Sequence, residues 1–184
     1  LYLYDLNTSQ ETMIVQNKYC EYINIYGNRV VWAGYDGNDG NIYMYDISTG
    51  LTQTICSNTA YQTQPKIYGD IIVWQDYRNK DPYNPNDKNA DIYMYDLGTG
   101  QEKAICTNSA YQSFPHVSGD KIVWQDYRNA SNPSNADIYM YNLTEGKEYA
   151  VCTAPGYQSA PCISGNKVVW QDFRTYAGNG DIYM

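Results

Sequence analysis

The stretch from Pro115 to Arg128 reads PHVSGDKIVWQDYR, and after a loop the chain continues from Asp137 as DIYMYNL. Two apolar runs flank Gly119-Asp120, a dipeptide that tolerates positive φ and is typical of a β-hairpin turn. The run after the loop alternates Ile and Met with Tyr, so both faces of the strand it predicts are apolar or aromatic. These segments therefore predict short antiparallel strands that need a dry neighbour on each side.

The same pattern recurs along the whole chain. Its Trp blocks end at Trp32, Trp74, Trp124 and Trp170 and lie 42, 50 and 46 residues apart. The head of each IYM block, however, always lies 33 residues before the next Trp. All variation in length therefore falls between a Trp block and the following IYM block, which we interpret as a loop, whereas the 33 residues form a unit.

Each unit predicts four strands: a P-x-I/V block, the Trp block, the IYM block, and a block ending at Cys56, Cys106 or Cys152. A repeated meander with two apolar faces predicts an all-β fold, a β-propeller of four-stranded antiparallel blades, with a solenoid as the poorer alternative. We expect one domain over 1–184 with units at approximately 1–16 (partial), 17–57, 58–107, 108–153 and 154–184 (partial). About four to five blades are visible. Because the third strand is duplicated, a fragment of a larger ring is favoured over a short closed ring.

Composition excludes several classes of protein. Twelve Lys and Arg against 20 Asp and Glu give a net charge of −8, which would repel nucleic acid. No apolar run approaches the roughly 20 residues of a membrane helix. Five cysteines rule out a fully paired set within the chain. The thiols of Cys56, Cys106 and Cys152 occupy equivalent outer positions and should stay reduced, while the state of Cys20 and Cys162 is left open.

The repeated string, P-x-I-S-G-D-K-I-V-W-Q-D-Y-R followed by D-I-Y-M-Y-D-L and I-C-T-N, resembles the TolB-like (WD-type) propeller repeat. Within that group it is similar to the version in cell-surface and surface-layer-associated proteins of methanogenic archaea. The resemblance covers essentially the whole chain and implies a propeller at the cell surface, although propellers host many unrelated functions. The first unit departs from the pattern, with Ala33-Gly34-Tyr35-Asp36 in place of Gln-Asp-Tyr/Phe-Arg.

The Gln-Asp-Tyr/Phe-Arg group could be mistaken for a catalytic carboxylate and cation. An active site is normally assembled once, whereas this group follows three successive Trp blocks, so we interpret it as structural. The structural set comprises Trp32, Trp74, Trp124, Trp170, Asp76, Arg78, Asp126, Arg128, Asp172 and Arg174. His116 is the only histidine, which leaves a zinc site or a Ser-His-Asp triad without support. No catalytic residue is therefore predicted.

Four variable loops, at 34–40, 79–90, 129–136 and 175–180, should open on one face of the propeller. Ligand recognition and neutral drift explain their variation equally well. The candidate binding residues are Asp36, Asn38, Asp39, Asp81, Asp87 and Asn129. Asp36, Asn38 and Asp39 are also weak calcium candidates, but the distal Glu of a calcium loop is missing, and no other cofactor is expected. Asn7, Asn129 and Asn142 match the glycosylation acceptor pattern.

These observations, with the resemblance, favour a non-enzymatic extracellular module. It would be a structural or adhesive part of an archaeal cell envelope or surface filament that binds protein or glycan through its loop-bearing face. One alternative is the gating propeller of a larger hydrolase such as an oligopeptidase. Another is a propeller that self-assembles through exposed blade edges.

Overall fold

The computed structural model describes residues 1–16, 18–36, 39–81, 83–84, 89–129, 135–174 and 180–184, with only the backbone of Asp36 and Asp39. The described residues form strands and turns and no helix. The strands are β1 (Tyr2–Asp5) and β2 (Gln10–Met13); β3 (Cys20–Tyr26), β4 (Arg29–Asp36), β5 (Asp39–Asp46) and β6 (Leu51–Cys56); β7 (Gln62–Tyr68), β8 (Ile71–Asp76), β9 (Asp91–Asp96) and β10 (Gln101–Cys106); β11 (Gln112–Ser118), β12 (Lys121–Asp126), β13 (Asp137–Asn142) and β14 (Lys147–Cys152); and β15 (Gln158–Ser164), β16 (Lys167–Asp172) and β17 (Asp181–Tyr183).

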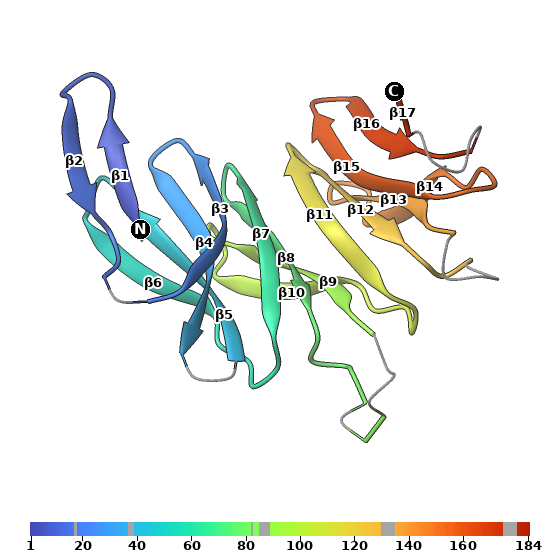
Figure 1. Ribbon diagram of the computed structural model, residues 1–184, viewed down its shortest axis with the longest axis horizontal. Coiled ribbons are helices and arrows are strands. Elements are labelled where there is room, and N and C mark those ends of the chain that lie inside the picture. Colours follow the sequence, from blue (N-terminus) through green and yellow to red (C-terminus); the bar gives the residue numbers. More distant parts are fainter. Residues whose placement is uncertain (17, 37–38, 82, 85–88, 130–134, 175–179) are drawn as a thin grey trace.

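Consecutive strands pair antiparallel in every sheet. β3–β6, β7–β10 and β11–β14 each form a four-stranded meander, while β1–β2 and β15–β17 form a two-stranded and a three-stranded sheet. The sheets succeed one another as blades along an open arc, with the two ends of the chain far apart (Figure 1). The predicted all-β propeller of four-stranded blades is therefore confirmed. No described helix has the length and apolar character needed to cross a membrane.

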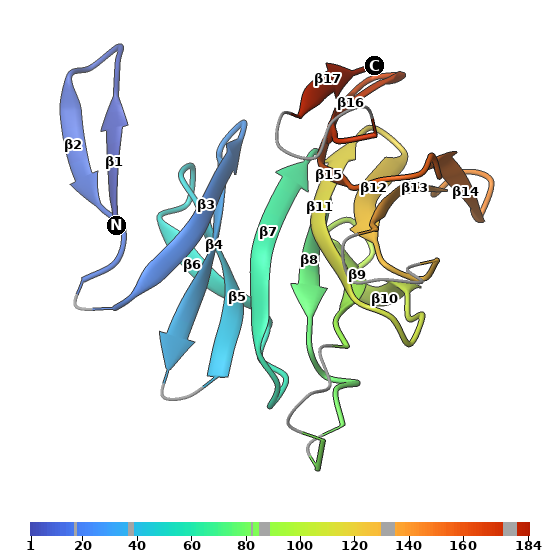
Figure 2. The same ribbon diagram turned by 45° about the vertical axis from the view of Figure 1, so that its right-hand side comes forward.

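The first strands of successive blades converge on a common inner side. β3 contacts β7, β7 contacts β11, and β11 contacts β15. In Figure 2 these inner strands lie in succession, while the later strands of each blade spread outward. Convergence at the first strand and divergence at the fourth is the geometry of a propeller rather than of a solenoid. The inner side of β3, β7, β11 and β15 is called the channel below.

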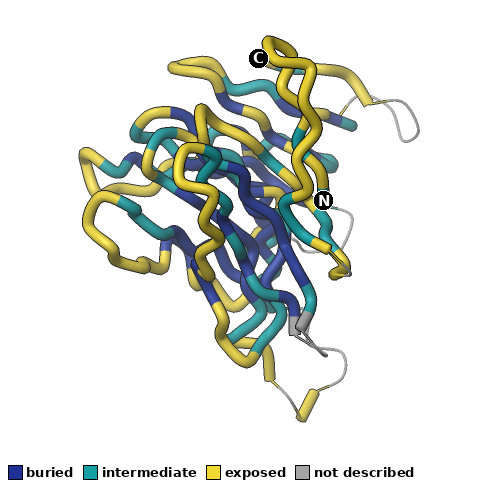
Figure 3. The backbone as a smooth tube through the Cα atoms, turned by 90° about the vertical axis from the view of Figure 1, so that its left-hand side faces the viewer, coloured by how far each residue is buried: buried dark blue, intermediate teal, exposed yellow. Residues whose placement is uncertain are grey.

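The hydrophobic cores lie between blades, not within them. Ile42 and Met44 of the first four-stranded blade pack in one cluster with Ile67 and Trp74 of the next. A second cluster repeats this packing at the following interface. Burial accordingly follows the middle of each blade and falls off at the outer edges (Figure 3). The blades β7–β10 and β11–β14 have a neighbouring blade on each side and their second strands are almost fully buried, as the double-faced apolar pattern predicts, whereas β1, β2 and β17 at the two ends are largely exposed.

The first loop is shorter than predicted. We expected a loop over 34–40, but β4 continues to Asp36 and β5 resumes at Asp39, with Gly34 opposite Asn41 and Tyr35 opposite Gly40. The first unit has the shortest connection between its Trp and IYM blocks, so the ladder continues to the pair of Asp36 and Asp39. Gly34 suits this position because a Cβ there would lie 2.9 Å from the Tyr43 ring.

The Trp, Asp and Arg of the repeated group form a buried cluster in each blade that has them. Trp124 Nε1 donates to Asp126 Oδ2 at 2.8 Å, and Arg128 Nη2 donates to the same oxygen at 2.6 Å. The backbone N–H of Arg128 donates to the other carboxylate oxygen at 2.8 Å. The Asp126 residue is fully buried, and three charge-assisted or polar donors compensate its desolvation.

The same guanidinium reaches the preceding blade. Arg128 lies 4.1 Å from the centre of the Tyr139 ring, and its Nη2 donates to Cys106 Sγ at 3.0 Å. Arg128 also pairs with Glu148 on β14. We call Trp124, Asp126, Arg128, Tyr139 and Cys106 the clamp. Its counterparts are Trp74, Asp76, Arg78, Tyr93 and Cys56, and Trp170, Asp172, Arg174, Tyr183 and Cys152.

The first four-stranded blade keeps the Trp and Tyr of the clamp, Trp32 and Tyr43, but lacks its aspartate, arginine and cysteine. Gly34 stands where the carboxylate would be, and Ile14, 18 residues before Trp32, stands where the other units have cysteine. A cavity of about 280 Å³ lies beside Trp32 and Tyr43 at this place, and the Lys18 ammonium is 5.8 Å from the centre of the Tyr43 ring. Cysteine, aspartate and arginine are therefore present together or absent together, which fits one structural unit.

Removing the clamp carboxylate should cost far more than removing an exposed one. In Asp126→Ala the Arg128 guanidinium and Trp124 N–H lose their shared acceptor, so we expect the free energy of unfolding to fall by about 3–5 kcal/mol in urea denaturation. Asp70→Ala is the control, because its pair with Arg29 is largely exposed and should be worth under about 1 kcal/mol. Similar losses in the two variants would contradict the structural role of the clamp.

The cysteines of the clamps should react with thiol reagents far more slowly than Cys162, which lies on the inner strand β15. All five cysteines are free, as expected for Cys56, Cys106 and Cys152. Burial raises the pKa of Cys56 to about 11 and that of Cys106 to about 12, whereas Cys162 is exposed. A thiol reagent at pH 8 should label Cys162 rapidly and the three buried thiols only after unfolding, as mass spectrometry of digested protein would show. Rapid labelling of Cys106 in the folded protein would contradict this packing.

Candidate functional site

Several predicted binding residues lie outside the described part of the structure. Asn38 and Asp87 are among the undescribed residues, and the side chains of Asp36 and Asp39 are not described either. The calcium and binding predictions on these residues stay predictions. Within the described ranges, no three His, Cys, Asp or Glu side chains gather as metal ligands.

The two described candidates of the loop-bearing face have local partners. Asp81 accepts the backbone N–H of Tyr83 at 2.9 Å within the β8–β9 connection. Asn129 donates its side-chain amide to Asp137 Oδ2 at 2.9 Å and to the Tyr139 hydroxyl at 2.8 Å. The side-chain amide of Asn129 therefore joins the two ends of the β12–β13 loop through these hydrogen bonds. The sequence did not predict this role.

The equivalent asparagine of the preceding blade, Asn79, contacts a buried acidic group, Asp91. Asn79 Nδ2 donates to Asp91 Oδ2 at 2.7 Å, while Asp91 Oδ1 has no hydrogen-bond partner among the described residues. Burial raises the pKa of Asp91 to about 6, and the hydrogen bond from Asn79 opposes this rise. Asp91 is thus a loop-base residue with a perturbed pKa rather than a ligand presented to solvent.

The glycosylation candidates differ in environment. Asn7 is exposed in the turn between β1 and β2. Asn142 is 7% exposed, its amide donates to Glu145 at 2.9 Å, and its Oδ1 accepts the N–H of Thr144 at 3.0 Å. An attached glycan needs a free amide nitrogen at the surface, so this environment favours Asn7 over Asn142.

An arc of aromatic rings crosses the blades at the loop-bearing end of the channel. Each blade supplies a pair joined through the backbone, as where Tyr127 N–H donates to Tyr111 O at 3.0 Å. Adjacent rings along the arc have centroids 5.2–6.4 Å apart. Its members are Tyr19, Tyr35, Tyr61, Tyr77, Tyr111, Tyr127, Tyr157 and Phe173. The signal for it was present in the sequence, because an aromatic residue occurs 13 positions before and three after every repeated Trp.

Hydrogen bonds fix the aromatic arc across blade boundaries. Gln125 Nε2 donates to the hydroxyls of Tyr127 and Tyr157 at 2.8 and 3.0 Å, and the two hydroxyls lie 3.2 Å apart. Burial, followed by the neighbouring hydroxyl of Tyr157, raises the pKa of Tyr127 above its ordinary value. The Tyr127 hydroxyl therefore stays protonated near neutral pH, and the aromatic arc forms a rim along the channel mouth.

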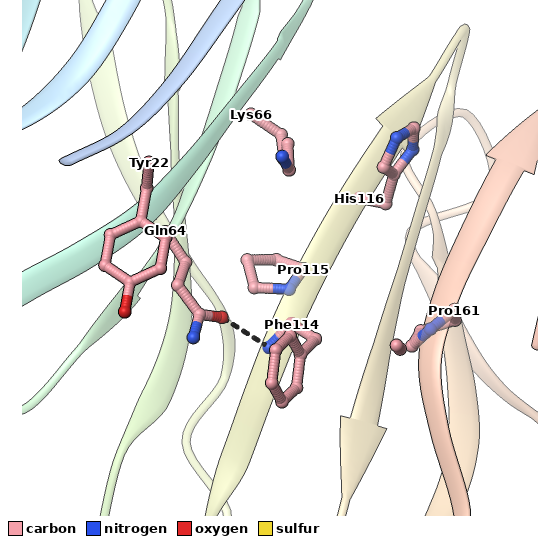
Figure 4. Close-up of a pocket in the computed structure, with 8 residues that line it drawn as sticks. Tyr22, Gln64, Lys66, Phe114, Pro115, His116 and Pro161 are labelled. Atoms are coloured by element: carbon pink, nitrogen blue, oxygen red, sulfur yellow. Dashed lines mark hydrogen bonds between the residues drawn. The ribbon is translucent and has the colours of Figure 1, made fainter. Parts of the chain in front are cut away.

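Below this rim, the inner strands enclose a pocket of about 290 Å³. The bulge in each inner strand places one residue with positive φ there, and at two of these positions the residue is aromatic, Tyr22 (φ 53°) and Phe114 (φ 52°). Figure 4 shows how these rings lie with Gln64, Lys66 and the prolines around the pocket. Its lining comprises Tyr22, Gln64, Lys66, Phe114, Pro115, His116, Ala160 and Pro161.

His116 lies on the inner strand β11. Its Nδ1 is 3.5 Å from the backbone N of Ile163, and its Nε2 is 3.4 Å from Cys162 Sγ. Burial, and then the charge of Lys66, lowers the pKa of His116. The imidazole is therefore neutral near pH 7, accepts the strand N–H through Nδ1, and links two inner strands.

The chain is similar in fold to several solved propellers. The alignment with putative TolB from Agrobacterium tumefaciens covers 79% of this chain and 53% of that chain, with a TM-score of 0.60 and 17% identity. On the β-propeller domain of the Trilobed protease from Pyrococcus furiosus the TM-score is 0.65 with 16% identity, over 90% of this chain and 53% of that one. On a prolyl endopeptidase the TM-score is 0.74 with 13% identity, over 98% of this chain and 30% of that one.

These likenesses establish the fold, a β-propeller, and the chain spans about half or less of each protein. No known protein family and no curated protein sequence matches the chain.

The buried carboxyl at the loop base generates a pH prediction. Because the pKa of Asp91 is raised from 3.8 to about 6 on folding, its contribution to stability is full below pH 4 and is lost as the pH rises through 6. Asp91→Asn should therefore be about 1–3 kcal/mol more stable than the native chain at pH 7, and the difference should vanish near pH 4. Asp81→Asn is the control in urea denaturation across this range. A loss of stability at pH 7 in Asp91→Asn would contradict the assigned environment.

Proposed function

We propose that the chain is a non-catalytic β-propeller binding module. It acts as a structural or adhesive component of an archaeal cell envelope or surface filament, outside the cell, and takes protein or glycan ligands on its loop-bearing face. The mouth of the channel, framed by the aromatic arc, belongs to the same face and forms part of the binding surface.

The observation that carries this proposal is that the repeated buried carboxylates are all paired within their own blades. Asp76, Asp126 and Asp172 each accept from a Trp and an Arg of their own blade in nearly the same geometry. Carboxylates committed to one guanidinium in three blades support a structural role, whereas a hydrolase needs a carboxylate or nucleophile that faces the substrate.

The surface features of the loop-bearing face support ligand binding. Tyr83 on the β8–β9 connection is 93% exposed, and the channel pocket presents the rings of Tyr22 and Phe114, each nearly half exposed. Exposed aromatic side chains supply contact area at low cost in conformational entropy, and they are enriched in recognition surfaces. The assignment to a cell envelope rests on the resemblance of the repeat to archaeal surface proteins, and the exposed acceptor motif at Asn7 is compatible with it.

A binding screen tests the proposal. Purified chain is applied to arrays of glycans and of envelope proteins from the source organism, and it is assayed in parallel for hydrolase and lyase turnover. We expect saturable binding and no turnover, with binding reduced at least several-fold by Tyr83→Ala or Phe114→Ala. Tyr149→Ala, which changes an exposed ring on the outer strand β14, is the matched control. Turnover that a single substitution in the channel abolishes would overturn the proposal.

A second candidate function is the propeller of a larger hydrolase that controls access to a separate catalytic domain. The fold likeness to the prolyl endopeptidase, over 98% of this chain, favours it. The gene on both sides of this segment distinguishes the two functions. An adjoining α/β segment with a G-x-S-x-G nucleophile motif supports the hydrolase, and surface-domain repeats or an anchor support the envelope module.

A further inference from the structure

We propose that the channel pocket binds a carboxylate-bearing sugar residue of an acidic glycan, with Lys66 as the partner of the carboxylate. This inference rests on the proposed function and names the class of ligand. Four observations carry it: the charge of the pocket, its aromatic walls, its amide donors, and the state of the neighbouring backbone.

Lys66 is the one charged residue among those that line the pocket. It occupies the inner-strand slot that holds Asn24 in the first unit and His116 in the third. Asn24 Oδ1 accepts the N–H of Ile67 at 3.0 Å, and His116 Nδ1 faces the N–H of Ile163, so both side chains serve the next blade. A lysine ammonium can only donate and cannot take over that role. Among the described residues it makes no ion pair.

The acidic character of the rest of the chain directs an anionic ligand to Lys66. The chain carries a net charge of −8, so most of its surface repels anions. Burial and Lys66 keep His116 neutral, which leaves a single positive charge at the pocket. An anionic ligand therefore gains its ionic contact here, between walls that exclude part of the solvent and strengthen the attraction.

The aromatic walls suit a ring-shaped ligand. Tyr22 and Phe114 are 47% and 44% exposed, and both stand on the bulges of their strands. The positive φ belongs to the bulge, since Gln64 and Ala160 share it, but the bulge itself does not require an aromatic side chain. The electron-rich face of an aromatic ring attracts the weakly positive C–H face of a pyranose. Two such rings beside a cation match a sugar that carries a carboxylate.

Gln64 supplies directional donors at the same place. Its Oε1 accepts the backbone N–H of Phe114 at 3.0 Å, as Figure 4 shows, which assigns the orientation of the amide. Nε2 donates to no other described residue, so its two N–H groups can donate to hydroxyl or carboxylate oxygens of a ligand. The volume of about 290 Å³ lies at the small end of ligand pockets, which fits one or two sugar units.

The backbone of the inner strands argues against a peptide that adds as an extra strand. The N–H groups of Ile67, Ile163 and Gly165 are already directed at side chains of the preceding blade, Asn24, His116 and Ser118. Strand addition needs unpaired backbone groups along an edge. A glycan needs only side-chain donors and ring faces, which the pocket offers.

Isothermal titration calorimetry with two matched probes tests the inference. The probes are an α-1,4-linked galacturonate trimer and the neutral galactose trimer of the same linkage. We expect the charged trimer to bind at least tenfold more tightly than the neutral one, and the difference to shrink as the salt concentration rises. Lys66→Gln should remove most of this difference. Lys147→Gln, a charge change of equal size on the exposed outer strand β14, should leave it unchanged.

Phe114→Ala should weaken both trimers, because it removes a ring face and no charge. Thermal melting of each variant verifies that the fold is retained. Equal affinity for the two trimers, no binding of either, or an unchanged preference in Lys66→Gln would overturn the inference. If the arrays described above still show ligands while the charged trimer fails, only this inference falls; if no ligand binds at all, the proposed function falls as well.

Discussion

The hydrogen bonds from Trp124 and Arg128 to one buried oxygen of Asp126 are the interaction on which the architecture depends. A fully buried carboxylate is costly unless it is paired and hydrogen-bonded. The cation that compensates it also contacts Cys106 on the outer strand of the preceding blade. The arginine that compensates the carboxylate of one blade therefore also contacts the preceding blade. The apolar clusters likewise form only where two blades meet.

This dependence explains how chemistry is distributed over the molecule. The residues that repeat, those of the clamps and of the aromatic arc, maintain the stack of blades, and Asn24 and His116 add contacts to an N–H of the next inner strand. Residues that break the repeat are released from that task. Lys66 and Phe114 are of this kind, and the structure brings both to the channel pocket. The repeat thus supplies a rigid frame, and its exceptions supply the surface that differs from blade to blade.

The sequence predicted the strands, turns and blades because each depends on a local pattern that occurs three or four times. Asp46 and Asp96, for example, stand at equivalent positions after the Tyr strands, and each accepts the N–H two residues further on. The structural reading of Asp126 also followed from repetition alone. The hydrogen bond from Arg128 to Cys106 of the preceding blade did not follow from repetition, because the two residues lie on strands of different blades and only packing shows which thiol the guanidinium contacts.

The candidate site was much less predictable. The pocket joins Tyr22, Lys66 and Phe114 from three blades; Tyr22 and Phe114 share one repeat position, ten residues before their Trp, but this spacing does not show that the three side chains meet in one pocket. Asn129 was interpreted as a surface ligand, yet it holds the base of its loop, because a side-chain amide in a loop does not reveal which group it will meet. The loop of the first blade was predicted too long, because residues 34–36 and 39–40 resemble a loop in composition although they continue the ladder between β4 and β5.

The central claim is that the clamp couples one blade to the next, and hydrogen exchange tests it most directly. Arg128→Lys keeps the charge but loses the planar fork that joins carboxylate, ring and thiol. Native-state exchange followed by mass spectrometry should then show faster exchange in β10 of the preceding blade as well as in β12 and β13. Loss of protection confined to β12 and β13, with β10 unchanged, would contradict the coupling.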